Sequence, residues 1–280
     1  MKHLLLLLLL AAVSTPAWAT FSLRVGDPRF SGSTQQGTIE EAVLSIRPKG
    51  LYLEYGLYLT FSARGTSYKA TDSLEVTLKF DLPAGAIVHD SWLWIYNDIV
   101  RAAIMDRWTA SSIYEGIVNR RQDPSVLFKT SATQHELRVF PMRGDERRKV
   151  KITYLMPADW NTEIVSAELP ISILKTSKNQ VTLFHVLTWP EADWQNPAIP
   201  DRPSLAFVAE ADSVFGQYYA TKLAAGDQVS GLRFAFDSPL KNGDYLRFYG
   251  SGQSGIYQLA MLPARQFDYE NKRKILLLLD

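Results

Sequence analysis

The stretch from residue 99 to residue 127 constrains the fold most, because the spacing of its apolar side chains changes partway along. Residues 99–108 are mostly apolar, as in a short strand. From Ala110 the apolar residues follow the i, i+3, i+4, i+7 and i+8 spacing of an amphipathic helix. Pro124 ends the pattern, since proline cannot continue a helical hydrogen-bond ladder. The sequence therefore predicts one short helix, over about residues 109–121, in a chain otherwise rich in strands.

Apolar patterning on both sides of this helix predicts strands. Residues 74–80 alternate strictly between apolar and polar, which is typical of a strand with one wet face. Residues 51–62 are apolar on both faces, as in a covered strand. A Pro-Ala-Gly turn leads into a strand at 86–96, and a Gly-Asp turn separates strands at 136–142 and 149–155. The expected fold class is mainly β.

A strand, a helix with the pattern Ala-x3-Tyr-x3-Val and an Asp-Pro stop together resemble the VIT domain of vault proteins and inter-alpha-trypsin inhibitor heavy chains. The flanking segments, residues 74–104 and 135–157, also resemble the strands and closing hairpin of that family. The resemblance implies a β-sandwich-like domain with one helix over residues 39–158, serving as a protein-interaction and structural module. The matching positions are Ala110, Tyr114, Val118, Asp123, Pro124 and Leu127.

The rest of the chain divides into three expected parts. Residues 20–38 are polar and rich in glycine, so we expect a loosely ordered lead-in. Residues 159–268 contain short strand-like runs with Pro, Gly and Asn between them, which indicates a second β-rich module. The proline-rich residues 189–203 suit a long surface loop within that module.

Residues 272–280 have the continuous hydrophobicity of a buried parallel strand, and the sequence stops there at Asp280. The VIT resemblance implies that a von Willebrand factor type A domain follows, of which this would be the first strand. Asp280 matches by position the first ligand of that domain's D-x-S-x-S metal site. One carboxylate does not make a site, so we expect no cofactor in this chain, and Mg²⁺ only if the chain continues past Asp280.

The first 19 residues are typical of a secretory signal peptide. A charged start is followed by an apolar run at 4–13 and by Ala17-Trp18-Ala19, so cleavage is expected after Ala19. No other stretch is apolar enough for a transmembrane helix, and the chain has no cysteine. We therefore expect an exported protein, periplasmic, cell-surface or secreted, and a bacterial envelope suits its lack of cysteine.

Charge and motifs argue against two classes of function. The 30 Lys and Arg residues nearly balance the 29 Asp and Glu residues, which disfavours nucleic acid as a partner. His89, His135 and His185 lie far apart, and neither a G-x-S-x-G nor an H-E-x-x-H motif is present. We expect no enzymatic activity.

Two groups of residues are candidate binding surfaces. Trp92, Trp94 and Tyr96 share a strand face and would suit sugar stacking, although large aromatic residues in strands more often belong to a core. Basic residues gather around the turn at 144–145, where a solvated outer face is favoured over an anion site. These basic residues are Arg143, Arg147, Arg148, Lys149 and Lys151. Arg143-Gly144-Asp145 spells the integrin-recognition tripeptide, but Gly-Asp is also what a tight turn requires.

Two hypotheses of function remain. In the first, the chain is an exported, non-enzymatic interaction or adhesion protein like the inter-alpha-trypsin inhibitor heavy chains, with a protein, matrix or envelope ligand. In the second, it is a carbohydrate-binding β-sandwich that uses the aromatic strand face.

Overall fold

The computed structural model describes residues 21–30, 32–101, 125–213, 216–240, 243–251 and 254–263. Strands dominate these residues, which confirms the prediction of a mainly β fold. The short helix α2 (Ile171–Leu174) and the 3-10 helix η1 (Ala225–Asp227) are the helical elements named among them. No helix in the described ranges is long and apolar enough to cross a membrane.

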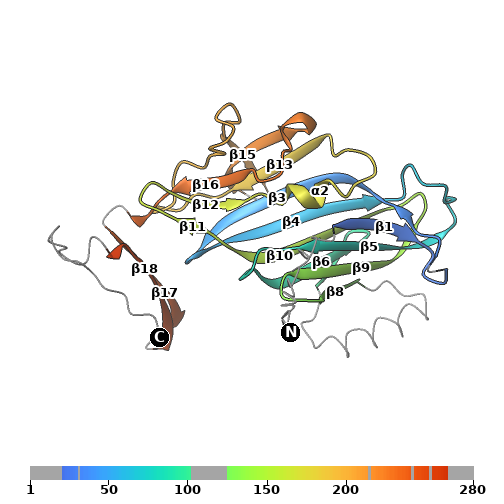
Figure 1. The fold of residues 1–280 in the computed structure, drawn as a ribbon, viewed down its shortest axis with the longest axis horizontal. Helices are drawn as coiled ribbons and strands as arrows, with labels where there is room; N and C mark the ends of the chain where they lie inside the picture. Colours follow the sequence, from blue (N-terminus) through green and yellow to red (C-terminus); the bar gives the residue numbers. More distant parts are fainter. Residues whose placement is uncertain are drawn as a thin grey trace, which may run out of the picture.

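The described strands form four sheets (Figure 1). The largest has eight strands, in the order β14 (Val208–Asp212), β15 (Gly216–Ala224), β13 (Leu183–Thr188), β3 (Thr38–Lys49), β4 (Tyr52–Ser62), β10 (Arg147–Pro157), β6 (Ile87–Ile95) and β7 (Asp98–Arg101). A five-stranded sheet has the order β2 (Gln35–Gln36), β1 (Ser22–Gly26), β5 (Ser73–Asp81), β9 (Gln134–Arg143) and β8 (Ser125–Lys129). A three-stranded sheet consists of β11 (Asp159–Trp160), β12 (Ile164–Glu168) and β16 (Arg233–Asp237). The hairpin β17 (Asp244–Ser251) and β18 (Ser254–Met261) forms the fourth.

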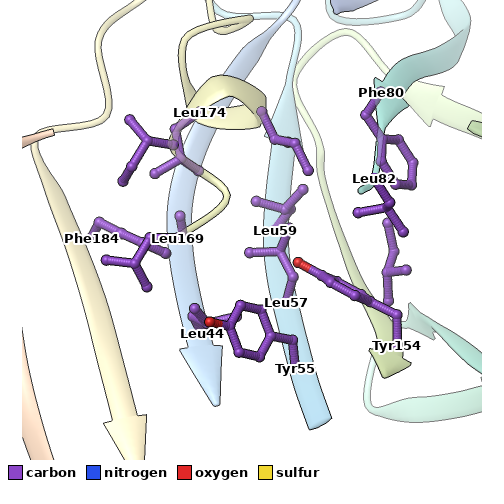
Figure 2. Packing of buried hydrophobic residues seen from close by; sticks show 14 of the residues in the cluster. Leu44, Tyr55, Leu57, Leu59, Phe80, Leu82, Tyr154, Leu169, Leu174 and Phe184 are labelled. Atoms are coloured by element: carbon purple, nitrogen blue, oxygen red, sulfur yellow. The ribbon is translucent and has the colours of Figure 1, made fainter. Parts of the chain in front are cut away.

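The eight-stranded sheet buries one face over its central strands, whereas the residues of its edge strands β14 and β7 are all exposed. Leu57 and Leu59 of β4 belong to the same core cluster as Phe80 of β5, so the five-stranded sheet covers this part of the face. Further along, Leu169 and Leu174, which follow β12, join the cluster beside Leu44 and Phe184 (Figure 2). The core is thus continuous beneath two smaller layers.

The boundary between the two expected modules, at residues 158 and 159, runs through this shared structure. Strand β13 lies beyond the boundary, yet it pairs in parallel with β3, with Val186 opposite Leu44. The buried Thr188 hydroxyl also donates to the Ile46 carbonyl, at 3.0 Å. The eight-stranded sheet therefore joins strands from both expected modules.

The lead-in expected at residues 20–38 is ordered in part, so the prediction of a loose segment is wrong for residues 22–26. These residues form β1, which pairs antiparallel with β5, and Leu23 and Val25 are fully buried. The alternation of two apolar residues over so short a strand is a weak signal, and glycines nearby conceal it.

The proline-rich residues 189–203 form a loop, as predicted, but its side chains are part of the core. Trp194 is 1% exposed, and its ring lies 5.2 Å from that of Trp160 and 5.7 Å from that of Tyr245. Its indole N–H donates to the Tyr245 hydroxyl, at 3.3 Å. The loop thereby links β11 to the β17–β18 hairpin.

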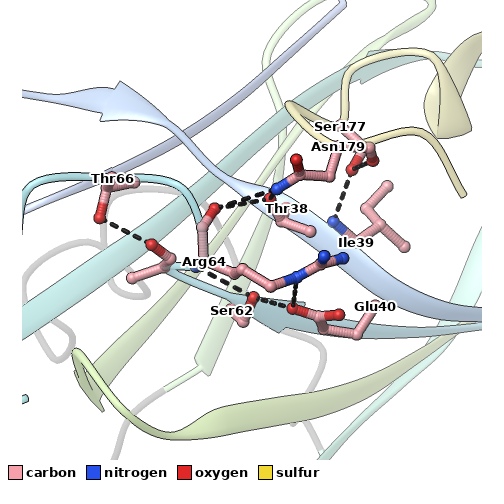
Figure 3. A network of polar contacts seen from close by, with 9 residues as sticks. Thr38, Ile39, Glu40, Ser62, Arg64, Thr66, Ser177 and Asn179 are labelled. Carbon is pink, nitrogen blue, oxygen red and sulfur yellow. Dashed lines mark hydrogen bonds and ion pairs between the residues drawn. The ribbon is translucent and has the colours of Figure 1, made fainter.

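A polar network joins the segment after α2 to strand β3, and strand β3 to the end of β4 (Figure 3). The Ile39 amide donates to the Ser177 hydroxyl at 2.8 Å, and the Asn179 side-chain amide donates to the Thr38 hydroxyl at 2.9 Å. Nearby, Glu40 accepts hydrogen bonds from Ser62 at 2.5 Å and Arg64 at 2.8 Å. The bonds from Ile39 and Asn179 fix the segment after α2 against the start of β3.

Replacing Glu40 with glutamine should make the free energy of unfolding depend less on pH in the acidic range. Burial disfavours the charged form of Glu40, but hydrogen bonds from Arg64 and Ser62 outweigh it and lower the pKa of the carboxyl below 4.5. A lowered folded-state pKa stabilises the fold above the unfolded pKa, and this contribution is lost as pH falls through the folded value. Urea unfolding should show Glu40→Gln to be less stable than the parent by about 1 kcal/mol at pH 7, and this difference should shrink as the pH falls below 4.5.

The exposed Glu163, replaced by glutamine, is the matched control, for which we expect the parent's pH profile. A constant difference between Glu40→Gln and the parent from pH 7 to pH 3 would contradict the assigned linkage.

Several predicted features lie outside the described residues. They are the helix at 109–121, the signal peptide at 1–19 with its cleavage site at Ala19, and the strand at 272–280 that ends at Asp280.

Candidate functional site: an aromatic and basic sheet face

The outer face of the eight-stranded sheet, opposite the core, carries a row of aromatic and basic side chains. Pairing places Tyr58 of β4 opposite Lys151 of β10, Lys151 opposite Trp92 of β6, and Trp92 opposite Arg101 of β7. Residues directly opposite on neighbouring strands share a face, so these side chains are neighbours. We call Tyr58, Trp92, Trp94, Arg101, Lys149 and Lys151 the aromatic–lysine patch.

Cations in the patch lie over aromatic rings. The Lys151 ammonium is 4.2 Å from the ring centre of Trp92 and 5.1 Å from that of Tyr58. The Lys149 ammonium is 5.0 Å from the Trp94 ring, and the Arg101 guanidinium is 4.7 Å from the Trp92 ring. Each such contact is worth roughly 0.5–1 kcal/mol at an exposed site.

Neighbouring groups fix the positions of these side chains. The Trp92 indole N–H donates to Asp90 at 2.5 Å, and the rings of Trp92 and Trp94 are 5.8 Å apart. Beside Tyr58 on the same face, Gly56 leaves room for Lys151, because an added Cβ would lie 2.9 Å from the Lys151 Cε atom. The absence of a side chain at Gly56 therefore lets the aliphatic part of the Lys151 side chain pack over β4.

The prediction that favoured a core position for the three aromatic residues is wrong. Trp92 and Trp94 are half-buried on the outer face, whereas Leu93 between them is 2% exposed. Tyr96 is 84% exposed at the turn after β6, with a φ of 54°, so it does not extend the row. The sequence pattern of a strand with two apolar faces does not show which face packs on the core. In β6 the face that carries Leu93 packs on the core, and the face that carries Trp92 and Trp94 is the outer one.

The predicted basic cluster separates into different environments. Lys149 and Lys151 share the outer face, as predicted. Arg148, which precedes Lys149, is 7% exposed and donates to the Pro141 carbonyl at 2.9 Å, so it supports the hairpin instead. The turn interpretation of Gly144-Asp145 is confirmed, since the Glu146 amide donates to the Arg143 carbonyl at 3.0 Å. An added Cβ at Gly144 would also lie 2.1 Å from the Lys69 carbonyl oxygen.

Sequence reasoning missed Tyr58 and Arg101 as members of this patch, and it treated the tryptophans and the lysines as separate features. The available signal was the outward position of Lys149 and Lys151 on a strand flanked by two others rich in aromatic residues. Only the strand order β4-β10-β6-β7 shows that the three strands are neighbours.

The histidines do not converge in the described structure. His89 lies 3.3 Å from Glu54, while His135 stacks on Phe80 with ring centres 5.5 Å apart. Burial lowers the pKa of His135, so its imidazole is neutral at pH 7. Within the described ranges, no group of three or more His, Asp or Glu side chains is placed to hold a metal ion.

The chemistry of the patch is that of a binding surface for negative charge. Its ammonium groups can each donate several hydrogen bonds, and the rings beneath them supply apolar contact area. A neutral sugar ring that stacked on Trp92 would have to displace the cations that lie over it. The geometry thus suits an anionic ligand better than a neutral one.

The fold and this face define a mainly β protein whose largest sheet carries an aromatic and basic outer surface. A family model described as "Vault protein inter-alpha-trypsin domain", abbreviated VIT, matches residues 54–154. Residues 54–154 therefore form a VIT domain, which includes most of β4, strands β5 to β9 and most of β10. Every VIT position predicted from the sequence lies within these limits, and of them Leu127 is described, half-buried in β8 and packed on the core.

No curated protein matches the chain. Among solved structures, a proposed nutrient-binding protein from Legionella pneumophila has 11% identity and a TM-score of 0.42, over 72% of this chain and 67% of its own. An M1 zinc metallopeptidase from Deinococcus radiodurans has 13% identity and a TM-score of 0.39, over 85% of this chain. The present chain spans about half of that peptidase, 51%.

Proposed function

We propose that this chain is an exported, non-enzymatic interaction protein whose VIT-containing sheet binds an acidic segment of a partner protein through the aromatic–lysine patch. The observation that carries the proposal is the row of three cations held over three aromatic rings on one sheet face. The VIT match supports a protein as the partner. Export is supported by the signal-like pattern of residues 1–19.

Binding of a fluorescent deca-glutamate peptide, measured by anisotropy at low salt, tests the proposal. The parent protein should bind this probe, and replacing both Lys149 and Lys151 with glutamine should weaken binding by about tenfold, since exposed ion pairs are worth up to ~1 kcal/mol each. Binding should also weaken as salt is added, because exposed charges are screened.

Lys222→Gln is the matched control, because Lys222 is an exposed lysine opposite His185 in the same sheet and has no ring contact within the described part of the chain. This variant should bind the peptide as the parent does. Equal losses in the control and in the double variant would indicate general charge attraction and would contradict a defined site.

The second candidate is carbohydrate binding by the same face, favoured by the outward position of Trp92 and Trp94. A soluble neutral glucan that quenches tryptophan fluorescence in the parent, and not in Trp92→Ala, would support it. Tighter binding in the Lys149→Gln, Lys151→Gln variant than in the parent would also favour sugar stacking, because the cations over the rings would be gone.

We further propose that, if the chain continues past Asp280, a following von Willebrand factor type A domain mediates adhesion. In that case Asp280 would supply the first oxygen ligand of a Mg²⁺ site, together with residues past the end of this sequence. Magnesium binding by a product that extends beyond Asp280, and its loss in Asp280→Ala, would test this role.

A further inference from the structure

A cavity of about 450 Å³ lies between the layers of the sandwich, on the side of β10 opposite the patch lysines. Its walls come from the end of β5, the start of β9, β10, and the link from β12 into α2. Figure 2 shows three of its residues, Leu82, Tyr154 and Leu169. Its volume is in the range of small-molecule binding sites. The lining residues are Phe21, Asp81, Leu82, Pro83, Ser131, Thr133, Gln134, Tyr154, Met156, Glu168, Leu169, Pro170, Ser172 and Ile173.

The lining combines apolar walls with negative charge. Leu82, Met156 and Leu169 are each at most 5% exposed and provide apolar surface. Two acidic residues, Asp81 and Glu168, are among the lining residues, and the described lining contains no lysine, arginine or histidine. The cavity therefore favours a positively charged group over a negatively charged one.

Asp81 lacks a donor in this environment. Its Oδ1 atom is buried and has no hydrogen-bond partner within the described structure. Such an unsatisfied group destabilises the fold, and more strongly when it is charged. The nearby His135 does not compensate for the charge, because burial lowers the pKa of its imidazole and leaves it neutral at pH 7.

Tyr154 supplies a neutral polar group in the same wall. Its side chain is 1% exposed, and burial raises the pKa of the hydroxyl well above its ordinary value. The phenol therefore remains protonated at neutral pH and can donate or accept a hydrogen bond.

We propose that this cavity binds a small organic amine, with its ammonium group paired with Asp81 and its apolar body against Leu82, Met156 and Leu169. The site is separate from the aromatic–lysine patch, since Tyr154 and Met156 face the core while Lys149 and Lys151 face outward from the same strand. The two proposals therefore stand or fall independently.

Isothermal titration calorimetry on the full chain tests this inference with three probes of similar size. Phenethylamine is cationic at pH 7, 2-phenylethanol is neutral, and 3-phenylpropanoate is anionic. We expect phenethylamine to bind at least tenfold more tightly than the alcohol, and 3-phenylpropanoate to bind most weakly. Equal affinities for the amine and the alcohol, or no heat from any probe, would overturn the inference.

Asp81→Asn keeps the size of the side chain and removes its charge, and circular dichroism melting confirms that the variant folds. It should bind phenethylamine at least tenfold more weakly than the parent, with its affinity for 2-phenylethanol unchanged. Asp145→Asn, at the exposed β9–β10 turn, is the matched control and should bind all three probes as the parent does. Unchanged phenethylamine binding in folded Asp81→Asn would rule out the assigned ion pair. The Lys149→Gln, Lys151→Gln variant should retain amine binding, which separates this site from the patch.

Discussion

Trp194→Ala should lower the free energy of unfolding by about 3–5 kcal/mol, as expected when a buried tryptophan is truncated in a packed interior. Trp194 is 1% exposed and touches aromatic rings from three other elements: Trp160 of β11, Phe236 of β16 and Tyr245 of β17. Its loss also removes the hydrogen bond to the Tyr245 hydroxyl. Urea unfolding followed by far-UV circular dichroism measures the change.

Trp189→Ala is the control for this prediction. Trp189 lies in the same loop but is half-buried, with the Arg47 guanidinium 4.0 Å from its ring. Its truncation should cost about 1 kcal/mol, which is the scale of an exposed cation–π contact. If both variants lost the same stability, the anchor role of Trp194 would be wrong.

Phe184→Ala should destabilise the whole described structure by about 3–5 kcal/mol and leave one unfolding transition. Phe184 is fully buried in β13, between β15 and β3, where the strands of the two expected modules meet. The cavity left by Phe184→Ala would remove packing contacts in the part of the core to which both expected modules contribute. Tryptophan fluorescence and far-UV circular dichroism should report the same midpoint in urea.

The neighbouring Leu183 points to the opposite face of β13 and is 37% exposed, so Leu183→Ala should change stability by less than about 0.5 kcal/mol. Two separate transitions in Phe184→Ala, with one unchanged from the parent, would show that the two parts unfold independently. That result would contradict a shared core.

Local pattern predicts much of this fold. The strict alternation at residues 74–80 corresponds to β5, and the turn chemistry at Pro83-Ala84-Gly85 and Gly144-Asp145 separates the predicted strand pairs. Strand β15 escaped prediction, although Ala220 and Leu223 are buried, because its sequence lacks a clear period of two. The parallel pairing of β13 with β3 could not be foreseen, since no local pattern encodes which distant strand becomes a neighbour.

The candidate site shows the same division between local and long-range information. Because strand side chains alternate with a period of two, the sequence predicts that Trp92 and Trp94 share a face and that Lys149 and Lys151 share a face. That these two pairs meet depends on β6 pairing with β10. Asp81 illustrates the other limit, because nothing in the sequence indicates that a carboxylate at the end of a strand will line a cavity.

The pairing of β3 with β13 also affects how the chain folds, because one edge of β3 can pair only after β13 is present. The Thr188 hydroxyl and the Ile46 carbonyl that it contacts are 142 residues apart in the chain, so one edge of β3 stays unpaired until β13 has been synthesised. Unpaired strand edges are templates for aggregation, and contacts between distant residues form slowly. We therefore expect this chain to need a chaperone, or rapid pairing of β13 with β3, to avoid aggregation during folding. A protein of the same size built from neighbouring hairpins would need such protection less.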